Sequence, residues 1–171
     1  LIPFVMFLSK TSTAAISEMN EAEKFRPIFV VGNSRSGTTL MGTILGRHAA
    51  VFRFEELHFF EELWSATGDD SSCSTEEAAT LAAKLFDIQR TGYLTRVDWR
   101  EFIDESQGLV KGIAQPLSPA KVFSAFISYE TKRQDKSRGC DQTPQNILYI
   151  AEILEHYPHA SIIHMIRDPR A

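Results

Sequence analysis

Two continuous apolar runs interrupt a chain whose apolar positions otherwise recur mostly at helical spacing. The run PIFVVGN, residues 27–33, leads into a glycine turn, and the run ASIIHMIR, residues 160–167, has five apolar residues in eight. Short runs rich in Val and Ile are typical of strands buried on both faces in a parallel sheet. TTLMGTILGRH, residues 38–48, follows the first run with apolar side chains three and four positions apart. The first unit is therefore predicted to be a strand, a glycine-rich turn and a helix.

Most of the sequence between the two runs has helical patterning. Helices are predicted over 52–64, after a short start, over 97–106 and over 118–134. Two more are predicted to begin at capping residues, one from Ser74 or Thr75 to about Ile88 and one from Thr143 to 158. Pro119 and Pro144 fall in the first turns of the last two helices, and the polar residues 65–75 predict a loop. Strands that alternate with helices predict an α/β fold with a central parallel sheet, here of the three-layer P-loop type.

The pattern also suggests how the chain is divided. Residues 1–24 form an N-terminal extension whose opening apolar stretch is too short to span a bilayer. Residues 25–171 are predicted to form one domain. The last strand is followed at once by a charged turn, so the domain is expected to be truncated at its C-terminus.

Composition narrows the classes of function. The chain has 171 residues, 43% hydrophobic and 23% charged, as in ordinary globular proteins. The net charge of −4 gives no general attraction for nucleic acid, so any anion site must be local. Cys73 and Cys140 lack CxxC spacing, which excludes a cysteine-based zinc site and argues against a disulfide framework. A single disulfide bond between these two cysteines is an alternative, but a reducing compartment is the simpler interpretation.

The stretch FVVGNSRSGTTL, residues 29–40, has the frame of a phosphate-binding loop. Gly32 and Gly37 allow a tight turn, and the following helix points its N-terminal N–H groups and positive dipole at one place. Nucleotide hydrolases place a lysine directly after the second glycine, where this chain has Thr38. Because a triphosphate needs that lysine and magnesium, a ligand with a single phosphate at this point fits better, with Arg35 facing the transferred group. The alternative is a turn that only connects strand and helix.

The sequence resembles the sulfotransferases that use 3′-phosphoadenosine 5′-phosphosulfate (PAPS). The resemblance rests on RSGTTL after FVVG and on YPHASIIHMIRDPRA near the end, and it covers roughly residues 27–62 and 139–171. In motif style it is nearest to the bacterial and tyrosylprotein types. It implies transfer of a sulfuryl group from PAPS to an acceptor hydroxyl or amine, without a metal.

The resemblance also implies how the donor is bound. Arg35 would contact the sulfonate and the bridging oxygen, and Arg167 would hold the 3′-phosphate. The 5′-phosphate would be held by four consecutive residues, Ser36, Gly37, Thr38 and Thr39. Independently, Arg167 follows the second strand, and ligands of open α/β sheets bind beyond the carboxyl ends of strands. An alternative is a local ion pair between Arg167 and Asp168.

Sulfuryl transfer to a hydroxyl needs a base that accepts its proton. The stretch FRFEELHFFEE offers four glutamates and one histidine, namely Glu55, Glu56, His58, Glu61 and Glu62. The resemblance to the tyrosylprotein type makes Glu56 the first choice and Glu55 the second. His58 is the alternative, and most of the glutamates are expected to lie on a solvated helix face.

The chain departs from the family pattern at two positions. Gln142 stands where relatives often have a lysine that neutralises the sulfonate, so a nearby cation is needed, from Lys132, Lys136 or Arg138. Without one, a PAPS-binding relative that lacks activity is an alternative, as is a P-loop nucleoside or small-molecule kinase. Arg53 stands where secretory relatives have a cysteine paired with the one at 140, which favours the cytoplasm.

The expected partner is an acceptor, and its identity stays open among small molecules, carbohydrates and peptides. Nucleic acid is not expected, nor is a membrane segment within this chain. A homodimer is compatible with the sequence.

Overall fold

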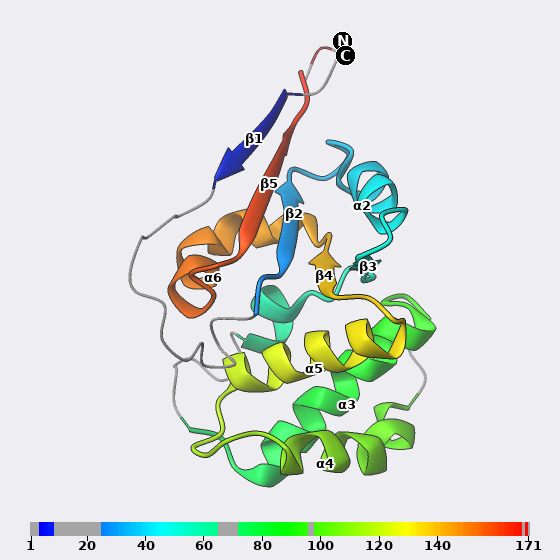
Figure 1. Ribbon diagram of the computed structural model, residues 1–171, viewed down its shortest axis with the longest axis vertical. Helices are drawn as coiled ribbons and strands as arrows, with labels where there is room; N and C mark the ends of the chain where they lie inside the picture. The colour runs from blue at the N-terminus through cyan, green and yellow to red at the C-terminus, as the bar shows by residue number, and fades with distance from the viewer. Residues whose placement is uncertain (1–3, 9–24, 65–71, 96–97, 169, 171) are drawn as a thin grey trace.

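A five-stranded sheet lies at the centre of the part of the chain that the computed structural model describes, residues 4–8, 25–64, 72–95, 98–168 and 170 (Figure 1). The strands are β1 (Phe4–Leu8), β2 (Ile28–Gly32), β3 (Val51–Arg53), β4 (Arg138–Asp141) and β5 (Ser161–Ile166). Their spatial order is β1-β5-β2-β4-β3. Strands β5, β2, β4 and β3 are mutually parallel, and β1 pairs with β5 antiparallel at one edge. The predicted α/β fold with a central parallel sheet is therefore confirmed.

The register of the sheet brings two distant segments together. Gly32, at the end of β2, pairs with Met165 near the end of β5. Both strands end at the upper edge of the sheet in Figure 1, and α2 (Thr38–Gly46) starts beside that edge. The turn after β2 and the segment after β5 therefore leave the sheet as neighbours.

The remaining helices lie near the predicted ranges. They are α3 (Thr75–Thr91), α4 (Ile103–Lys111), α5 (Pro119–Arg133) and α6 (Ile150–His156), with the π-helix η1 (Phe59–Trp64) and the 3₁₀-helices η2 (Trp99–Phe102) and η3 (Pro144–Tyr149). A cap forms as predicted at the start of α3, and Pro119 lies in the first turn of α5 as predicted, whereas the ranges predicted over 97–106 and from Thr143 to 158 each consist of a 3₁₀-helix followed by an α-helix. Ser74 rather than Thr75 is the N-cap of α3, because its side chain and that of Glu77 bond each other's backbone N–H groups. The helix ends at Thr91, beyond the predicted Ile88.

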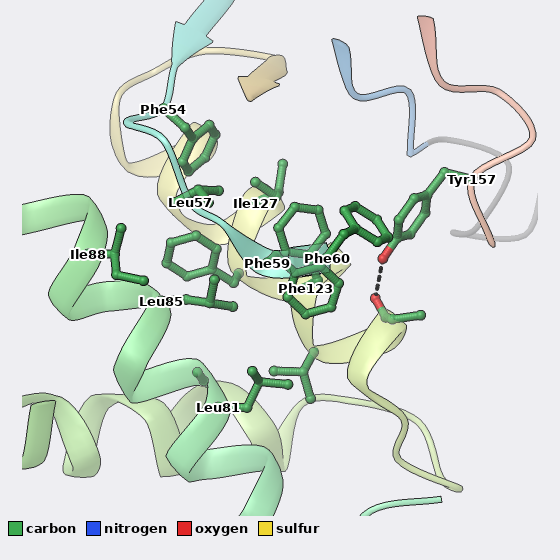
Figure 2. Close-up of a cluster of buried hydrophobic side chains, with 14 of the residues drawn as sticks. Phe54, Leu57, Phe59, Phe60, Leu81, Leu85, Ile88, Phe123, Ile127 and Tyr157 are labelled. Atoms are coloured by element: carbon green, nitrogen blue, oxygen red, sulfur yellow. Dashed lines mark hydrogen bonds between the residues drawn. The ribbon is translucent and has the colours of Figure 1, made fainter. Parts of the chain in front are cut away.

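Different helices pack on the two faces of the sheet. On one face, α2 packs its Met41 and Leu45 against a small cluster of strand residues that includes Val30, Ile163 and Met165. The other face carries an aromatic core between the sheet and η1, α3, α5 and α6, in which the rings of Phe59 and Phe123 stack 4.2 Å apart (Figure 2). The sheet thus lies between two helical layers.

The prediction of a helix over 52–64 is wrong for its first half. Residues Val51–Arg53 form β3, which pairs with β4, and the N–H of Phe54 donates to the Cys140 carbonyl at 2.8 Å. Only η1, at the end of the predicted range, is helical. Strand β4 itself was not predicted, because Arg-Gly-Cys-Asp is short and has no apolar run. The loop predicted over 65–75 falls largely outside the described residues.

Candidate active site at the strand carboxyl ends

The turn between β2 and α2, residues 32–37 and hereafter the glycine loop, has the tight backbone that its sequence predicts. The N–H of Ser36 donates to the Asn33 carbonyl at 3.1 Å, and Arg35 has a positive φ of 65°. Gly37 has a φ of 103°, a conformation that favours glycine, and it directly precedes the first turn of α2. The loop therefore ends at a helix N-terminus, where the first N–H groups have no partner within the helix.

Two features inside the glycine loop fit an anion. A Cβ on Gly32 would lie 2.5 Å from the Met165 carbonyl oxygen and 2.7 Å from Ser36 Oγ, so only glycine allows this packing. Ser36 Oγ is buried and has no hydrogen-bond partner among the described residues. A buried hydroxyl without a partner is costly, and a bound oxyanion would satisfy it. Thr38 is also buried at the start of α2, whereas Thr39 is exposed.

The two predicted arginines meet at this loop. Arg167 follows β5, and its Nη1 lies 3.5 Å from the carbonyl oxygen of Arg35, which is 132 positions earlier in the chain. Both side chains are exposed. Asp168 accepts hydrogen bonds from Arg170, through its N–H at 2.9 Å and its Nε at 3.0 Å. Two cationic side chains therefore lie at the carboxyl ends of neighbouring strands.

The structure separates the two candidate glutamates. Glu55 is paired with Arg53, with 2.9 Å between Arg53 Nη2 and Glu55 Oε1. Glu56 is half-buried, and this burial, together with the nearby charges of Asp141 and Glu55, raises its pKa, although His58 opposes the rise. Among the described residues no arginine pairs with Glu56, and a carboxylate with a raised pKa and no such partner is better suited to accept a proton.

His58 lies between two carboxylates. Its Nδ1 is 3.0 Å from Glu61 Oε2, and its Nε2 is 3.7 Å from Glu56 Oε2. The ring packs on Tyr93 with 4.1 Å between centroids, and the hydroxyl of Tyr93 donates to Glu62. The side chain is 9% exposed. Three of the five residues that the sequence offered as bases, Glu56, His58 and Glu61, are thus in one group.

Asp141, at the carboxyl end of β4, anchors this group and was missed by the sequence analysis. Its Oδ1 accepts from Thr143 Oγ1 at 2.7 Å and from the Thr143 N–H at 3.0 Å, and its Oδ2 accepts from Asn146 Nδ2 at 2.9 Å. Complete burial raises the pKa of Asp141, and these hydrogen bonds oppose the rise. An aspartate that ends a buried strand before Thr-Pro was the available signal, but no apolar run marked the strand.

Thr143 has a different role from the one predicted. It occupies the N-cap position of η3, but its side chain makes no capping hydrogen bond. Its Oγ1 instead accepts from the N–H groups of Leu57 at 2.9 Å and His58 at 3.3 Å. Thr143 therefore ties the glutamate segment to Asp141 and β4.

The cation expected near Gln142 is not supplied by Lys136 or Arg138. Lys136 Nζ donates to the Ala49 carbonyl at 2.9 Å, and Arg138 donates to the Arg26 carbonyl at 2.6 Å and to Ser161 Oγ at 2.7 Å. Both precede or begin β4, at the opposite end of the strand from the site. Gln142 is buried against α2, where a Cβ on Gly42 would overlap its Oε1.

Other site types were also sought in the described part of the chain. It contains no group of three or more His, Cys, Asp or Glu side chains that could hold a metal ion. None of its helices combines the length and the apolar character that a membrane span requires. Cys73 and Cys140 are both free thiols, and burial raises the pKa of Cys140 to about 12.

Comparison with known proteins agrees with this geometry. Residues 27–171 match the model of the sulfotransferase family. An uncharacterized protein of Aquifex aeolicus (strain VF5) is 31% identical over 145 residues, which are 84% of this chain and 16% of that relative. The chain thus spans about a sixth of the length of the relative it matches. No solved structure was found to match. The family match covers the four parallel strands of the sheet, the glycine loop and both arginines, and the chain therefore belongs to the sulfotransferase family.

Proposed function

We propose that this protein transfers the sulfuryl group of PAPS to a hydroxyl or amine acceptor. Family membership supports sulfuryl transfer in general. The observation that carries the choice of donor is the approach of Arg167 Nη1 to within 3.5 Å of the Arg35 carbonyl oxygen. Two anion-binding segments at neighbouring strand ends suit one nucleotide with phosphate groups at both its 3′ and 5′ positions.

The residues around the glycine loop fit such a donor, which supplies the activated sulfuryl group. The N–H groups at the end of the loop and in the first turn of α2, together with Ser36 Oγ and the Thr38 and Thr39 hydroxyls, would hold the 5′-phosphate. The exposed guanidinium of Arg35 would face the sulfonate and stabilise the charge that develops on the departing phosphate oxygen. Arg167 would hold the 3′-phosphate.

Glu56 is proposed as the base that accepts the acceptor's proton. Glu55 is retained as the second choice, but its pairing with Arg53 argues against it. The acceptor would be a small molecule, a carbohydrate or a peptide. A cytoplasmic location and a homodimer also belong to the proposal, and the two free cysteines support the former.

Calorimetry tests the choice of donor. We expect 3′,5′-diphosphoadenosine to bind at least about tenfold more tightly than adenosine 5′-monophosphate, since a charge-assisted contact is worth more than about 1.4 kcal/mol. Arg167→Ala should abolish this preference. Arg170→Ala is the matched control, because Arg170 pairs with Asp168 and should leave the preference intact. No preference in the parent protein would reject the proposal, and magnesium-dependent ATP binding in its place would indicate a kinase.

A second candidate, a PAPS-binding protein without turnover, is favoured by Gln142. This side chain is neutral, and its Oε1 is buried without a hydrogen-bond partner among the described residues. If the missing cation limits turnover, Gln142→Lys should raise the rate at which 3′,5′-diphosphoadenosine is released from PAPS. A parent protein that already turns over and is not accelerated by Gln142→Lys would reject this candidate.

A further inference from the structure

The imidazole of His58 is held in place from several sides. Its backbone has a φ of 50°, in the left-handed region that few non-glycine residues adopt, and its N–H is bound by Thr143 Oγ1. Its ring lies against Tyr93 and its side chain is almost fully buried. Strained backbone that persists in a well-packed setting is often found at functional sites. The position of the ring is therefore set by the fold around it.

The contact with Glu61 selects one tautomer of this ring. Nδ1 lies 3.0 Å from Glu61 Oε2, and a carboxylate can only accept, so Nδ1 carries the proton. In neutral imidazole, Nε2 then has a lone pair and can accept a proton. Nε2 is the atom that faces Glu56, 3.7 Å from its Oε2. This separation is longer than a hydrogen bond, and a small movement of the half-exposed Glu56 side chain would close it.

We propose that Glu61 and His58 are positioning residues that make Glu56 an effective base. Glu61 fixes the tautomer of His58, and His58 receives the proton that Glu56 takes from the acceptor. This inference rests on the proposed function, because it requires Glu56 to be the base. The arrangement extends the site by two residues, with the nearly buried His58 between two partly exposed carboxylates, Glu56 and Glu61.

The proton and the bonds balance in this scheme. The acceptor oxygen forms its bond to sulfur while the bond from sulfur to the phosphate oxygen breaks, and that oxygen keeps the electron pair. The acceptor's proton passes to Glu56 and then to His58 Nε2. The resulting imidazolium is stabilised by the Glu61 carboxylate, whose side chain is 40% exposed. Deprotonation by solvent restores the neutral ring.

The charged groups that face His58 support this direction of transfer. Glu56 and Glu61 contact the ring, the buried Asp141 interacts with its charge, and Tyr93 covers one side with its hydroxyl bonded to Glu62. Carboxylates therefore approach from η1, from the segment before it and from β4, with a neutral phenol from the turn after α3. An imidazolium formed by transfer from Glu56 would lie among negative charges, which attract it.

Nitrogen-15 NMR of histidine-labelled protein tests the tautomer without a substrate. The parent should show His58 protonated at Nδ1, and the signal is assigned by its loss in His58→Gln. Glu61→Gln should shift the ring toward the Nε2-protonated form. Glu155→Gln, an exposed glutamate on α6, is the control and should change nothing. An Nε2-protonated ring in the parent would overturn the proposal.

Kinetics test whether the tautomer matters for turnover. The probe is release of 3′,5′-diphosphoadenosine from PAPS with water as the acceptor, measured against pH. Glu61→Gln should lower kcat at least about tenfold with an unchanged KM for PAPS, as for a residue that acts through a base. His58→Gln should also move the acid limb of the profile to higher pH, because His58 lowers the pKa of Glu56.

The outcomes separate this inference from the proposed function. A parent protein that neither binds 3′,5′-diphosphoadenosine nor releases it from PAPS rejects the proposed function, and this inference with it. A parent that turns over while Glu61→Gln behaves like Glu155→Gln rejects the inference alone. A merely structural role for Glu61 would lower the unfolding temperature and leave the kcat of the folded fraction unchanged, which also contradicts the proposal.

Discussion

Two arginines of this protein lie in opposite surroundings. Arg90 on α3 donates to both carboxylate oxygens of Glu105, at 2.7 and 2.9 Å, and to Glu130 at 2.6 Å, while its guanidinium lies 4.5 Å from the ring centre of Phe86. Arg35 in the glycine loop is exposed and has no carboxylate partner among the described residues. The first arginine joins α3, α4 and α5, and the second is available to a ligand.

The carboxylates of the two regions, Glu105 beside Arg90 and Glu56 beside His58, also differ in how strongly they are paired. Hydrogen bonds from Arg90 and Tyr129 lower the pKa of Glu105 to about 2, whereas burial raises the pKa of Glu56. Strong partners fix a charge and stabilise the fold, whereas desolvation without such partners leaves a group ready to exchange a proton. We therefore propose that the Arg90 cluster is structural and that the Glu56 group is functional, and substitutions in each region should separate stability from activity.

The largest effect is expected from Glu56→Gln. Glutamine keeps the shape of the side chain but cannot accept the proton, so release of 3′,5′-diphosphoadenosine from PAPS should slow about 10²- to 10⁴-fold. The unfolding temperature should change little, because Glu56 is only half-buried and its contact with His58, at 3.7 Å, is long for an ion pair. Glu155→Gln is the control for both measurements. Full activity in Glu56→Gln would move the role of base to Glu55 or His58.

Arg90→Met is expected to lower stability and to leave binding unchanged. Loss of the guanidinium breaks the ion pairs with Glu105 and with the buried Glu130, which keeps Arg133 at 3.1 Å. The free energy of unfolding in urea should therefore fall by about 2 kcal/mol. Affinity for 3′,5′-diphosphoadenosine should be unchanged in the folded protein. Arg100→Met is the matched control, since Arg100 is 70% exposed beside Asp98 and should cost less than about 0.5 kcal/mol. A loss of affinity without a loss of stability would reverse the assignment of the two regions.

The elements that the sequence predicted well are those encoded by local patterns. Apolar runs mark β2 and β5, and Ser74 with Glu77 marks the start of α3. Strands β3 and β4 are short and include charged residues, so only their pairing with each other and with β2 defines them. The helix predicted over 52–64 failed for the same reason, because sheet pairing overrode a helical pattern.

The candidate site also combines residues marked by local sequence patterns with residues placed only by tertiary contacts. Arg35 and Arg167 belong to motifs that can be recognised along the chain, and the parallel register of β2 and β5 makes their meeting a consequence of the fold. Asp141 and Tyr93 belong to no motif. Asp141 joins the group around His58 through Thr143, which accepts from the distant His58 N–H, and Tyr93 joins it through ring packing on His58. Local patterns indicate which residues can bind anions, but the partners that tune a base depend on tertiary packing.

A smaller effect, with opposite signs in stability and binding, is expected from Ser36→Ala. The substitution removes a buried hydroxyl without a partner, so the free energy of unfolding should stay constant or rise by about 1 kcal/mol. Affinity for 3′,5′-diphosphoadenosine should fall about tenfold, because one hydrogen bond to the phosphate is lost. In the control Ser124→Ala, the lost hydroxyl donates to the Ala120 carbonyl, so stability should fall slightly and affinity should not change. Lower stability with unchanged affinity in Ser36→Ala would show that this hydroxyl has a structural partner.

The smallest effect concerns acid stability. The pKa of Glu105 falls from its usual 4.5 to about 2 on folding, so its contribution is present above pH 4.5 and is lost as the pH falls toward 2. Near neutral pH, Glu105→Gln should therefore lower the free energy of unfolding by about 1 kcal/mol, since the pair with Arg90 is partly exposed and screened. That difference from the parent should shrink steadily across this pH window in urea titrations. Glu56 has a raised pKa, so the sign is opposite for Glu56→Gln: any difference in stability should favour the variant over the parent near neutral pH and should disappear on acidification. If the two variants gave the same pH dependence, the contrast between the two regions would have to be abandoned.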